Sequence, residues 1–170
     1  MPSSIVIKFA KLLADHKLTV SVVESATAGR LAYELSQTEY AGSILKGGIV
    51  CYDACIKQDL MGIPKNLIDK FTPESAEVTK AITHALGKII PADIYIGVTG
   101  LPKAGGSETD EKPVGTMFVH ILFQGLDIAD RSEFSGGSET VIEKCVNRIA
   151  ELIIENVERN LFWELLKGER

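Results

Sequence analysis

The sequence has 170 residues, of which 45% are hydrophobic and 24% charged, and its formal net charge is −5. This length suits one globular domain, and no apolar stretch reaches the roughly 18–20 residues that a membrane span needs. The acidic charge argues against a surface that coats nucleic acid, and Lys8 and Lys11 interrupt an N-terminal run that would otherwise resemble a secretory signal. Three cysteines, an odd number, favour reduced thiols in a cytoplasmic protein.

The first part of the chain alternates between helical and extended patterns. Apolar residues at helical spacing predict a helix from Ser4 to His16, and an alternating run then predicts a strand from Leu18 to Glu24. A helix is expected from about Thr27 to Ser36. A β-rich run from Ile44 to Tyr52 and a helix from Ala54 to Leu60 follow.

The second part begins with Thr72-Pro73-Glu74, a typical helix start, and the helix it opens is expected to bury Val78, Ile82, Ala85, Leu86 and Ile89. The remaining predicted elements are strands at Ile94–Val98 and Thr116–Phe123, a long loop from Gly100 to Val114, an edge strand at Asp127–Phe134 and a helix at Glu139–Val157. This alternation predicts an α/β protein, a three-layer α/β/α sandwich with a mixed, largely parallel central sheet.

The first predicted strand is followed directly by a hydroxyl side chain, Ser25, in the run Glu24-Ser25-Ala26-Thr27-Ala28-Gly29. A strand-to-helix turn of this kind exposes a side chain at the carboxyl end of the sheet and points helix N–H groups at whatever binds there. Such groups would stabilise an anion or a developing oxyanion. The alternative is that Ser25 or Thr27 simply caps the helix, a role for which these residue types are preferred.

A second candidate region is Gly47-Gly48-Ile49-Val50-Cys51-Tyr52, followed by Lys57. Two glycines allow close approach to the backbone. A serine nucleophile needs a base, and His16, His84 and His120 suggest no Ser-His-Asp set, whereas a lysine held neutral by burial can serve. Taken alone, Lys57 is more often a solvated helix residue and Tyr52 a packing residue.

A third candidate is Val98-Thr99-Gly100, which leads into the long loop and then into Glu111-Lys112-Pro113-Val114-Gly115-Thr116. A threonine at the end of a buried strand can offer its hydroxyl and a backbone N–H to a ligand, although an ordinary strand end is the simpler interpretation. Cys51 and Cys55 have no second pair of cysteines or histidines nearby in sequence, so neither a metal nor another cofactor is expected.

The order of these motifs resembles the CinA C-terminal domain family, the competence-damage-inducible proteins, from about Phe9 to Asn156. Gly62-Ile63-Pro64 adds to the resemblance. It implies one amidase-like domain over residues 1–170, an α/β/α fold and a homodimer. It also implies that a small nucleotide or amide is the substrate. Active members hydrolyse the carboxamide of nicotinamide mononucleotide to nicotinate mononucleotide and ammonia.

The resemblance also implies residue roles. Ser25 would be the nucleophile, Lys57 its base, Tyr52 a supporting hydroxyl, and Thr99 a contact to the reacting group. Substrate-binding positions would be Glu24, Thr27, Gly48, Gly100, Lys103 and Arg131. No nucleic acid or membrane partner is expected.

The chain departs from the family pattern at Ala26 and Ala28, which replace a cysteine and a glycine, and at Ser138, which replaces an arginine suited to a phosphate. These departures leave three readings open. The chain is a nicotinamide-nucleotide amidase, a catalytically impaired relative that binds a small ligand or a protein, or an amidase acting on an amide without phosphate. The apolar run Leu161-Phe162-Trp163 is either a final helix packed on its own domain or a dimer contact.

Overall fold

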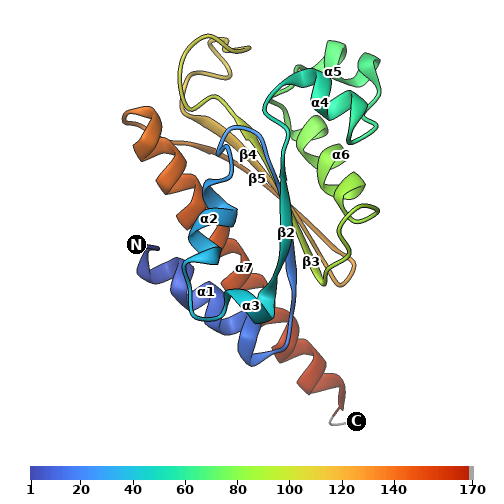
Figure 1. Cartoon of the computed structure of the whole chain (residues 1–170), viewed down its shortest axis with the longest axis vertical. Helices are drawn as coiled ribbons and strands as arrows, with labels where there is room; N and C mark the ends of the chain where they lie inside the picture. Colours follow the sequence, from blue (N-terminus) through green and yellow to red (C-terminus); the bar gives the residue numbers. More distant parts are fainter. Residues whose placement is uncertain (169–170) are drawn as a thin grey trace.

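The computed structural model describes residues 1–168, and the side chains of residues 1–159. Its centre is a five-stranded sheet in the order β2-β1-β3-β4-β5 (Figure 1). The strands are β1 (Val20–Glu24), β2 (Leu45–Val50), β3 (Ile94–Gly100), β4 (Thr116–Phe123) and β5 (Leu126–Glu133). The predicted strands are therefore all present, each within a few residues of its expected bounds.

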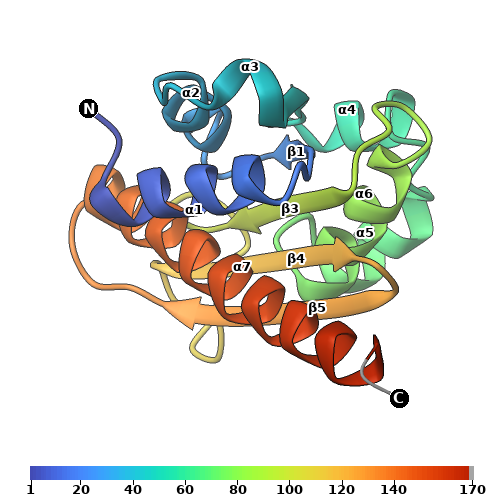
Figure 2. The same cartoon turned by 90° about the horizontal axis from the view of Figure 1, so that it is seen from below.

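Helices cover both faces of the sheet, which gives the predicted three layers (Figures 1 and 2). One face carries α1 (Ser4–Asp15), α2 (Arg30–Ser36), α3 (Ala41–Ile44) and α7 (Ser138–Gly168). The other carries α4 (Ala54–Asp59), α5 (Lys65–Phe71) and α6 (Ala76–Leu86). Among the described helices, none is both long and apolar enough to cross a bilayer.

The strand directions explain why the sheet is mixed yet largely parallel. β1 pairs in parallel with β2 and β3, whereas β4 is antiparallel to both β3 and β5. Consequently β4 is the one strand of this sheet that runs against the others. The carboxyl ends of β1, β2 and β3 meet at one edge, where parallel sheets commonly bind ligands.

Two apolar clusters separate the layers. The larger lies between the sheet and α1, α2 and α7, and includes Phe9, Leu31 and Ile149. The smaller lies under α4, α5 and α6, and includes Val23, Met61 and Ile82. β1 is buried at every position because helices cover both of its faces, whereas β2 at the edge alternates between half-buried and exposed residues.

Two helix starts differ from the prediction. Ser75, not Thr72, caps α6, because its Oγ accepts from the N–H of Val78. Thr72 instead ends α5, a helix that the sequence pattern did not predict, and has φ 68°. α2 begins at Arg30 rather than near Thr27, because the preceding residues form a turn.

The C-terminal helix is longer than predicted, since α7 continues past Val157 to Gly168. Its described inner face includes Val141, Cys145, Ile149 and Ile153, all buried as expected. The side chains of Leu161-Phe162-Trp163 lie outside the described residues.

Candidate active site

Ser25 lies at the point where three strands end together. Its backbone N–H donates to the carbonyl of Val98 at 2.9 Å, and the N–H of Cys51 donates to the carbonyl of Glu24 at 2.8 Å. These two hydrogen bonds continue the pairing of β1 with β3 and β2 by one residue. The position of Ser25 is therefore fixed by the sheet rather than by a mobile loop.

Lys57 reaches Ser25 from α4. Its Nζ lies 3.0 Å from Ser25 Oγ, 2.8 Å from the Cys51 carbonyl oxygen and 3.4 Å from the Tyr52 carbonyl oxygen. The Asp53 side chain caps α4 by accepting from the N–H of Cys55, and Lys57 lies on the inner side of this short helix. Two residues that are 32 positions apart in sequence thus form a direct contact.

Burial sets the protonation behaviour of Lys57. The side chain is 1% exposed, and this desolvation lowers the pKa of Lys57 from its ordinary value. Negative charge on Cys51, Glu74 or Asp53 acts in the opposite direction without reversing the shift. All three hydrogen-bond partners of Nζ are uncharged, so the direct contacts do not require an ammonium group.

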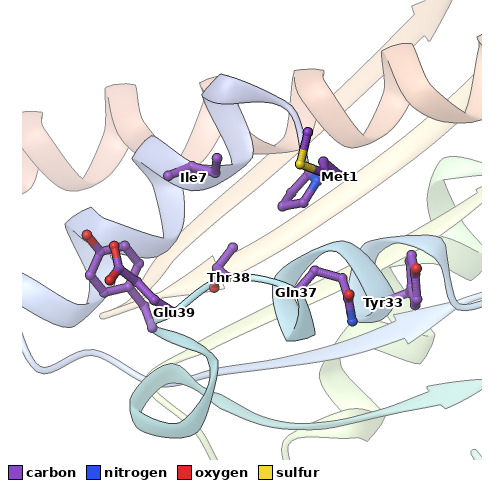
Figure 3. A pocket seen from close by; sticks show the side chains of 8 residues that line it. Met1, Ile7, Tyr33, Gln37, Thr38 and Glu39 are labelled. Atoms are coloured by element: carbon purple, nitrogen blue, oxygen red, sulfur yellow. The ribbon is translucent and has the colours of Figure 1, made fainter.

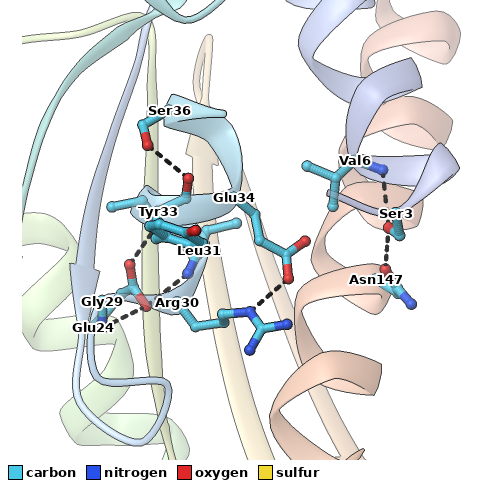
Figure 4. Close-up of polar contacts among 11 residues, drawn as sticks. Ser3, Val6, Glu24, Gly29, Arg30, Leu31, Tyr33, Glu34, Ser36 and Asn147 are labelled. Atoms are coloured by element: carbon cyan, nitrogen blue, oxygen red, sulfur yellow. Dashed lines mark hydrogen bonds and ion pairs between the residues drawn. The ribbon is translucent and has the colours of Figure 1, made fainter. Parts of the chain in front are cut away.

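The Glu24 carboxylate organises the turn after β1 (Figure 4). One of its oxygens accepts from the N–H groups of Gly29 and Leu31, each at 3.1 Å, and the other accepts from Ala32 at 2.8 Å. Glu24 is 1% exposed. A carboxylate is favourable at a helix N-terminus, so Glu24 holds α2 in place rather than facing a ligand.

A hollow of about 140 Å³ opens in front of Ser25. The loop after β3 forms one wall, and Tyr52 and Glu74 contribute to the rest. The lining residues are Ser25, Ala26, Tyr52, Glu74, Gly100, Leu101, Pro102, Lys103, Ala104, Gly105 and Gly106. Gly100 is required here, because a Cβ at this position would lie 2.7 Å from the carbonyl oxygen of Thr116.

Lys112 anchors the loop that forms this wall. Its Nζ donates to Thr72 Oγ1 at 2.7 Å, to the Glu74 carbonyl at 2.9 Å and to Ser107 Oγ at 2.7 Å. Ser107 in turn donates to the Glu74 carboxylate at 2.6 Å. The loop is therefore tied to the segment between α5 and α6.

The structure brings several of the sequence-predicted residues together and separates others. Ser25, Tyr52, Gly100 and Lys103 line the hollow, and Lys57 contacts Ser25 from behind it. Among the described residues, the Tyr52 hydroxyl makes no hydrogen bond to the pair, and the Tyr52 carbonyl is the group that contacts Lys57.

Thr99, Gly48 and Arg131 do not line the hollow. The Thr99 hydroxyl is fully buried against Thr79 Oγ1 at 2.8 Å. A Cβ on Gly48 would lie 2.6 Å from a methyl group of Val22, so this glycine is needed for packing under α2. Arg131 on β5 donates to the Glu111 carbonyl and to the Glu133 carboxylate.

Thr27 is also absent from the hollow's lining, although it follows Ser25 closely. It is 2% exposed, and its Oγ1 has no hydrogen-bond partner among the described residues. The expectation that Thr27 touches substrate is therefore not supported by its position.

Sequence reasoning missed Glu74 and Lys112. Glu74 was assigned to a helix start, and nothing in its local pattern indicates that it lines a hollow. Lys112 belongs to the Glu-Lys-Pro-Val-Gly-Thr block, so the sequence signal was present but had no assigned role. Both residues act through contacts between segments more than 30 positions apart.

A larger hollow, of about 590 Å³, lies between α1 and the end of α2 (Figure 3). Met1, Ile7, Tyr33, Gln37, Thr38 and Glu39 are among its lining residues. The lining includes no lysine, histidine or cysteine. The carboxylate of this hollow, on Glu39, is exposed, whereas the Ser25–Lys57 pair is buried, so the smaller hollow at Ser25 is the better candidate for chemistry.

Comparison with known proteins agrees with the motif order. A model of the CinA C-terminal domain matches residues 3–157. A CinA-like protein from Thermotoga maritima is 32% identical over 151 residues, covering 89% of this chain and 36% of that protein. A CinA-like protein from Leptospira biflexa is 34% identical over 148 residues, covering 86% and 35%. The chain spans about a third of the length of these relatives.

Solved structures show the same fold. The competence damage-inducible protein A from Klebsiella pneumoniae superposes with a TM-score of 0.85 at 23% identity, covering 91% of this chain and 95% of that chain. A competence-damaged protein (CinA) superfamily member from Enterobacter cloacae gives 0.80 at 27% identity, covering 88% and 91%.

Proposed function

The chain belongs to the CinA C-terminal domain family, and we propose that it is an amidohydrolase with Ser25 as nucleophile and Lys57 as base. The proposed substrate is nicotinamide mononucleotide, whose carboxamide is converted to a carboxylate with release of ammonia. The observation that carries the proposal is the 3.0 Å contact between Lys57 Nζ and Ser25 Oγ in a fully buried setting.

In the structure Lys57 Nζ donates to all three oxygens, Ser25 Oγ included, and a neutral amine keeps two of these bonds. A neutral amine has two N–H donors and one lone pair. The carbonyls of Cys51 and Tyr52 can accept the two N–H bonds, which leaves the lone pair facing Ser25 Oγ. In that state Ser25 donates its proton to Lys57, which is the orientation a general base requires.

The acylation step follows from this arrangement. Ser25 Oγ attacks the carboxamide carbon while its proton passes to Lys57 Nζ, and the carbonyl oxygen becomes an oxyanion. The backbone N–H of Ala26, which lines the hollow, donates no hydrogen bond within the described residues, so it is available to hold that oxyanion. Lys57 then passes its proton to the amide nitrogen, the C–N bond breaks, and ammonia leaves.

Deacylation reverses the roles. Water attacks the ester carbon and gives its proton to Lys57. The tetrahedral species collapses, Ser25 Oγ recovers a proton from Lys57, and the acid product leaves. Lys57 therefore accepts and passes on one proton in each half of the cycle, from Ser25 to ammonia and then from water to Ser25, and its neutral form is restored after each half.

The size and charge of the hollow bear on the substrate. A volume of about 140 Å³ is below the roughly 300–1,000 Å³ typical of sites that enclose a whole drug-sized ligand. The carboxamide end would enter the hollow, and the rest of the molecule would extend over the loop. Lys103 is the one cationic residue in the lining, and Glu74, which also lines the hollow, carries the opposite charge. This balance favours, as a second candidate, an amide that carries no phosphate.

The test is ammonia release from purified protein supplied with nicotinamide mononucleotide or with free nicotinamide. Lys57→Met should lower kcat by about 10²–10⁴-fold, because it removes the general base. Ser25→Ala should lower it at least as much, because it removes the nucleophile. Lys65→Met on α5 is a matched control, since Lys65 is exposed and pairs with Asp69 on the surface.

Equal loss in Ser25→Ala and Lys57→Met with full activity in Lys65→Met supports the mechanism. Activity on nicotinamide but not on the nucleotide would select the second candidate. Activity that both active-site variants retain would overturn the assignment of the pair. No activity on either amide would favour a catalytically impaired relative that keeps the fold.

A further inference from the structure

Two histidines and an aspartate that are distant in sequence meet at the opposite end of the sheet from Ser25. His84 lies near the end of α6, His120 lies on β4 opposite Gly97, and Asp127 lies at the start of β5. One side-chain donor atom from each lies within 4.8 Å of the other two. Ser25 follows the carboxyl end of β1, so this cluster is separate from the proposed catalytic pair.

His120 is the buried member of the cluster. Its side chain is 4% exposed, and its Nε2 lies directly against Asp127 Oδ1. This contact pairs the ring nitrogen with the carboxylate, and no other described residue hydrogen-bonds to Nε2. A buried imidazole nitrogen whose one polar neighbour among the described residues is a carboxylate oxygen belongs to a donor set that transition metal ions bind.

His84 completes a convergent set of donors. Its Nε2 is 3.8 Å from Asp127 Oδ2, and its ring centroid is 5.9 Å from that of His120. Imidazole nitrogens and a carboxylate oxygen are standard zinc ligands at about 2.0–2.2 Å from the ion. Ligand atoms around such an ion lie roughly 3–3.5 Å apart, so small side-chain rotations are enough to close this set.

We propose that His84, His120 and Asp127 bind a divalent transition metal ion, with Zn²⁺ as the representative ion. Three protein ligands leave a fourth tetrahedral position for water. A surface hollow of about 300 Å³, lined in part by His84, Asp127 and the turn between β4 and β5, gives that position access to solvent. Two nitrogen donors favour zinc and its neighbours in the series over Mg²⁺ or Ca²⁺.

Lys80 modifies the site in two ways. Its Nζ lies 2.6 Å from Asp127 Oδ2, which orients the carboxylate and leaves Oδ1 toward the His120 ring. A hydrogen bond of this kind to a ligating carboxylate is typical of metal sites. The positive charge of Lys80 also opposes a second cation, so the affinity is expected to be moderate.

Metal binding here would tie α6 to the hairpin of β4 and β5. β5 is an edge strand, and a ligand held jointly by three elements stabilises the folded state in proportion to its occupancy. The site therefore predicts a stabilising effect of Zn²⁺ that does not depend on amidase activity.

The test is titration of untagged, chelator-treated protein with Zn²⁺ by calorimetry, with Co²⁺ absorption as a spectroscopic probe. Wild type should bind about one ion per chain. His84→Ala and Asp127→Asn should each weaken binding by at least about tenfold, because each loses a ligand. Both residues are partly exposed, so these variants are expected to fold.

The matched control is His16→Ala, which removes the third histidine of the chain at an exposed position. Binding should be unchanged in this variant, and Zn²⁺ should raise the unfolding temperature of wild type but not of His84→Ala. Equal affinity in wild type, His84→Ala and Asp127→Asn would overturn the proposal. So would the absence of saturable binding, or a Co²⁺ spectrum dominated by thiolate charge transfer, which would assign the ion to a cysteine.

Discussion

Lys57 shows how burial changes the meaning of a common residue. Its local sequence is that of any lysine on a helix. In the structure α4 directs its side chain inward, and two carbonyl oxygens and one hydroxyl oxygen lie within 3.4 Å of its Nζ. The chemistry proposed for this site depends on the amine being neutral, and burial is the physical cause that favours the neutral form.

This dependence predicts the pH profile of the proposed activity. Because the base is neutral Lys57 and burial lowers its pKa below the ordinary 10.5, kcat/KM should rise with pH and level off before that value. The measurement is the initial rate of ammonia release across the neutral and alkaline range. A rate that falls as pH rises through that range would contradict a lysine base.

Ala28 carries backbone strain in the turn after Ser25. Its φ of 49° lies in the left-handed region, which disfavours a side chain with a Cβ. Ala28→Gly should therefore stabilise the fold by about 0.5–1 kcal/mol, after the entropy cost of glycine is subtracted. Urea unfolding measures this change. Ala85→Gly inside α6 is the control and should destabilise the protein, so a loss of stability in both variants would show that Ala28 is not strained.

At the scale of single elements, α2 is a short helix that depends on its N-terminal partner. Seven residues are too few for a stable isolated helix, and Gly29 provides no side-chain cap. The Glu24 carboxylate supplies that function from the preceding strand through three backbone N–H groups. The same contacts fix the turn that contains Ser25.

Glu24→Gln should therefore destabilise the protein by about 1–3 kcal/mol, because charge-assisted hydrogen bonds are lost and an amide N–H₂ faces backbone donors. Glu39→Gln, at an exposed position, is the matched control and should change stability little. Chemical unfolding of both variants gives the comparison. Equal stability of Glu24→Gln and the control would show that the carboxylate is not the cap of α2.

The elements were more predictable than the site. Local apolar periodicity was enough to locate the strands and the helices α1, α4 and α7, because these patterns depend on neighbouring residues. It failed at α5 and at the start of α6, where Thr72 resembles an N-cap but ends a helix. The turn at Ser25 was predictable from its hydroxyl and small residues.

The contacts that complete the site were not predictable from local sequence. These contacts depend on how distant segments meet across the sheet. They are the contacts of Ser25 with Lys57, of Lys112 with Thr72, and of His120 with Asp127 and His84. The expectation that no metal binds rests on the spacing of cysteines and histidines along the chain, and it stays a prediction that the metal titration tests.

At the scale of the whole molecule, the two proposed sites lie at opposite ends of the central sheet. The carboxyl ends of β1 to β3 position the proposed nucleophile and base, while the opposite end positions the proposed metal ligands. α6 contributes to both regions, since Glu74 precedes it beside the hollow and His84 lies in its last turn. The two sites can therefore be tested independently with variants at either end.

The association state is a prediction at this scale. Family resemblance and the apolar run near the C-terminus both suggest that two chains associate. Light scattering of the purified protein should give about twice the mass of one chain, since twofold dimers are the commonest assembly. A mass equal to one chain over the working concentration range would contradict the prediction.

The central claim is that Lys57 activates Ser25, and labelling by a fluorophosphonate probe tests it without depending on the substrate. Peptide mass spectrometry should locate the label on Ser25 of the wild type and of Lys65→Met. Labelling should be slower by about 10²-fold or more in Lys57→Met, where no base removes the serine proton. Equal labelling rates in wild type and Lys57→Met, or label distributed over other serines, would contradict the claim.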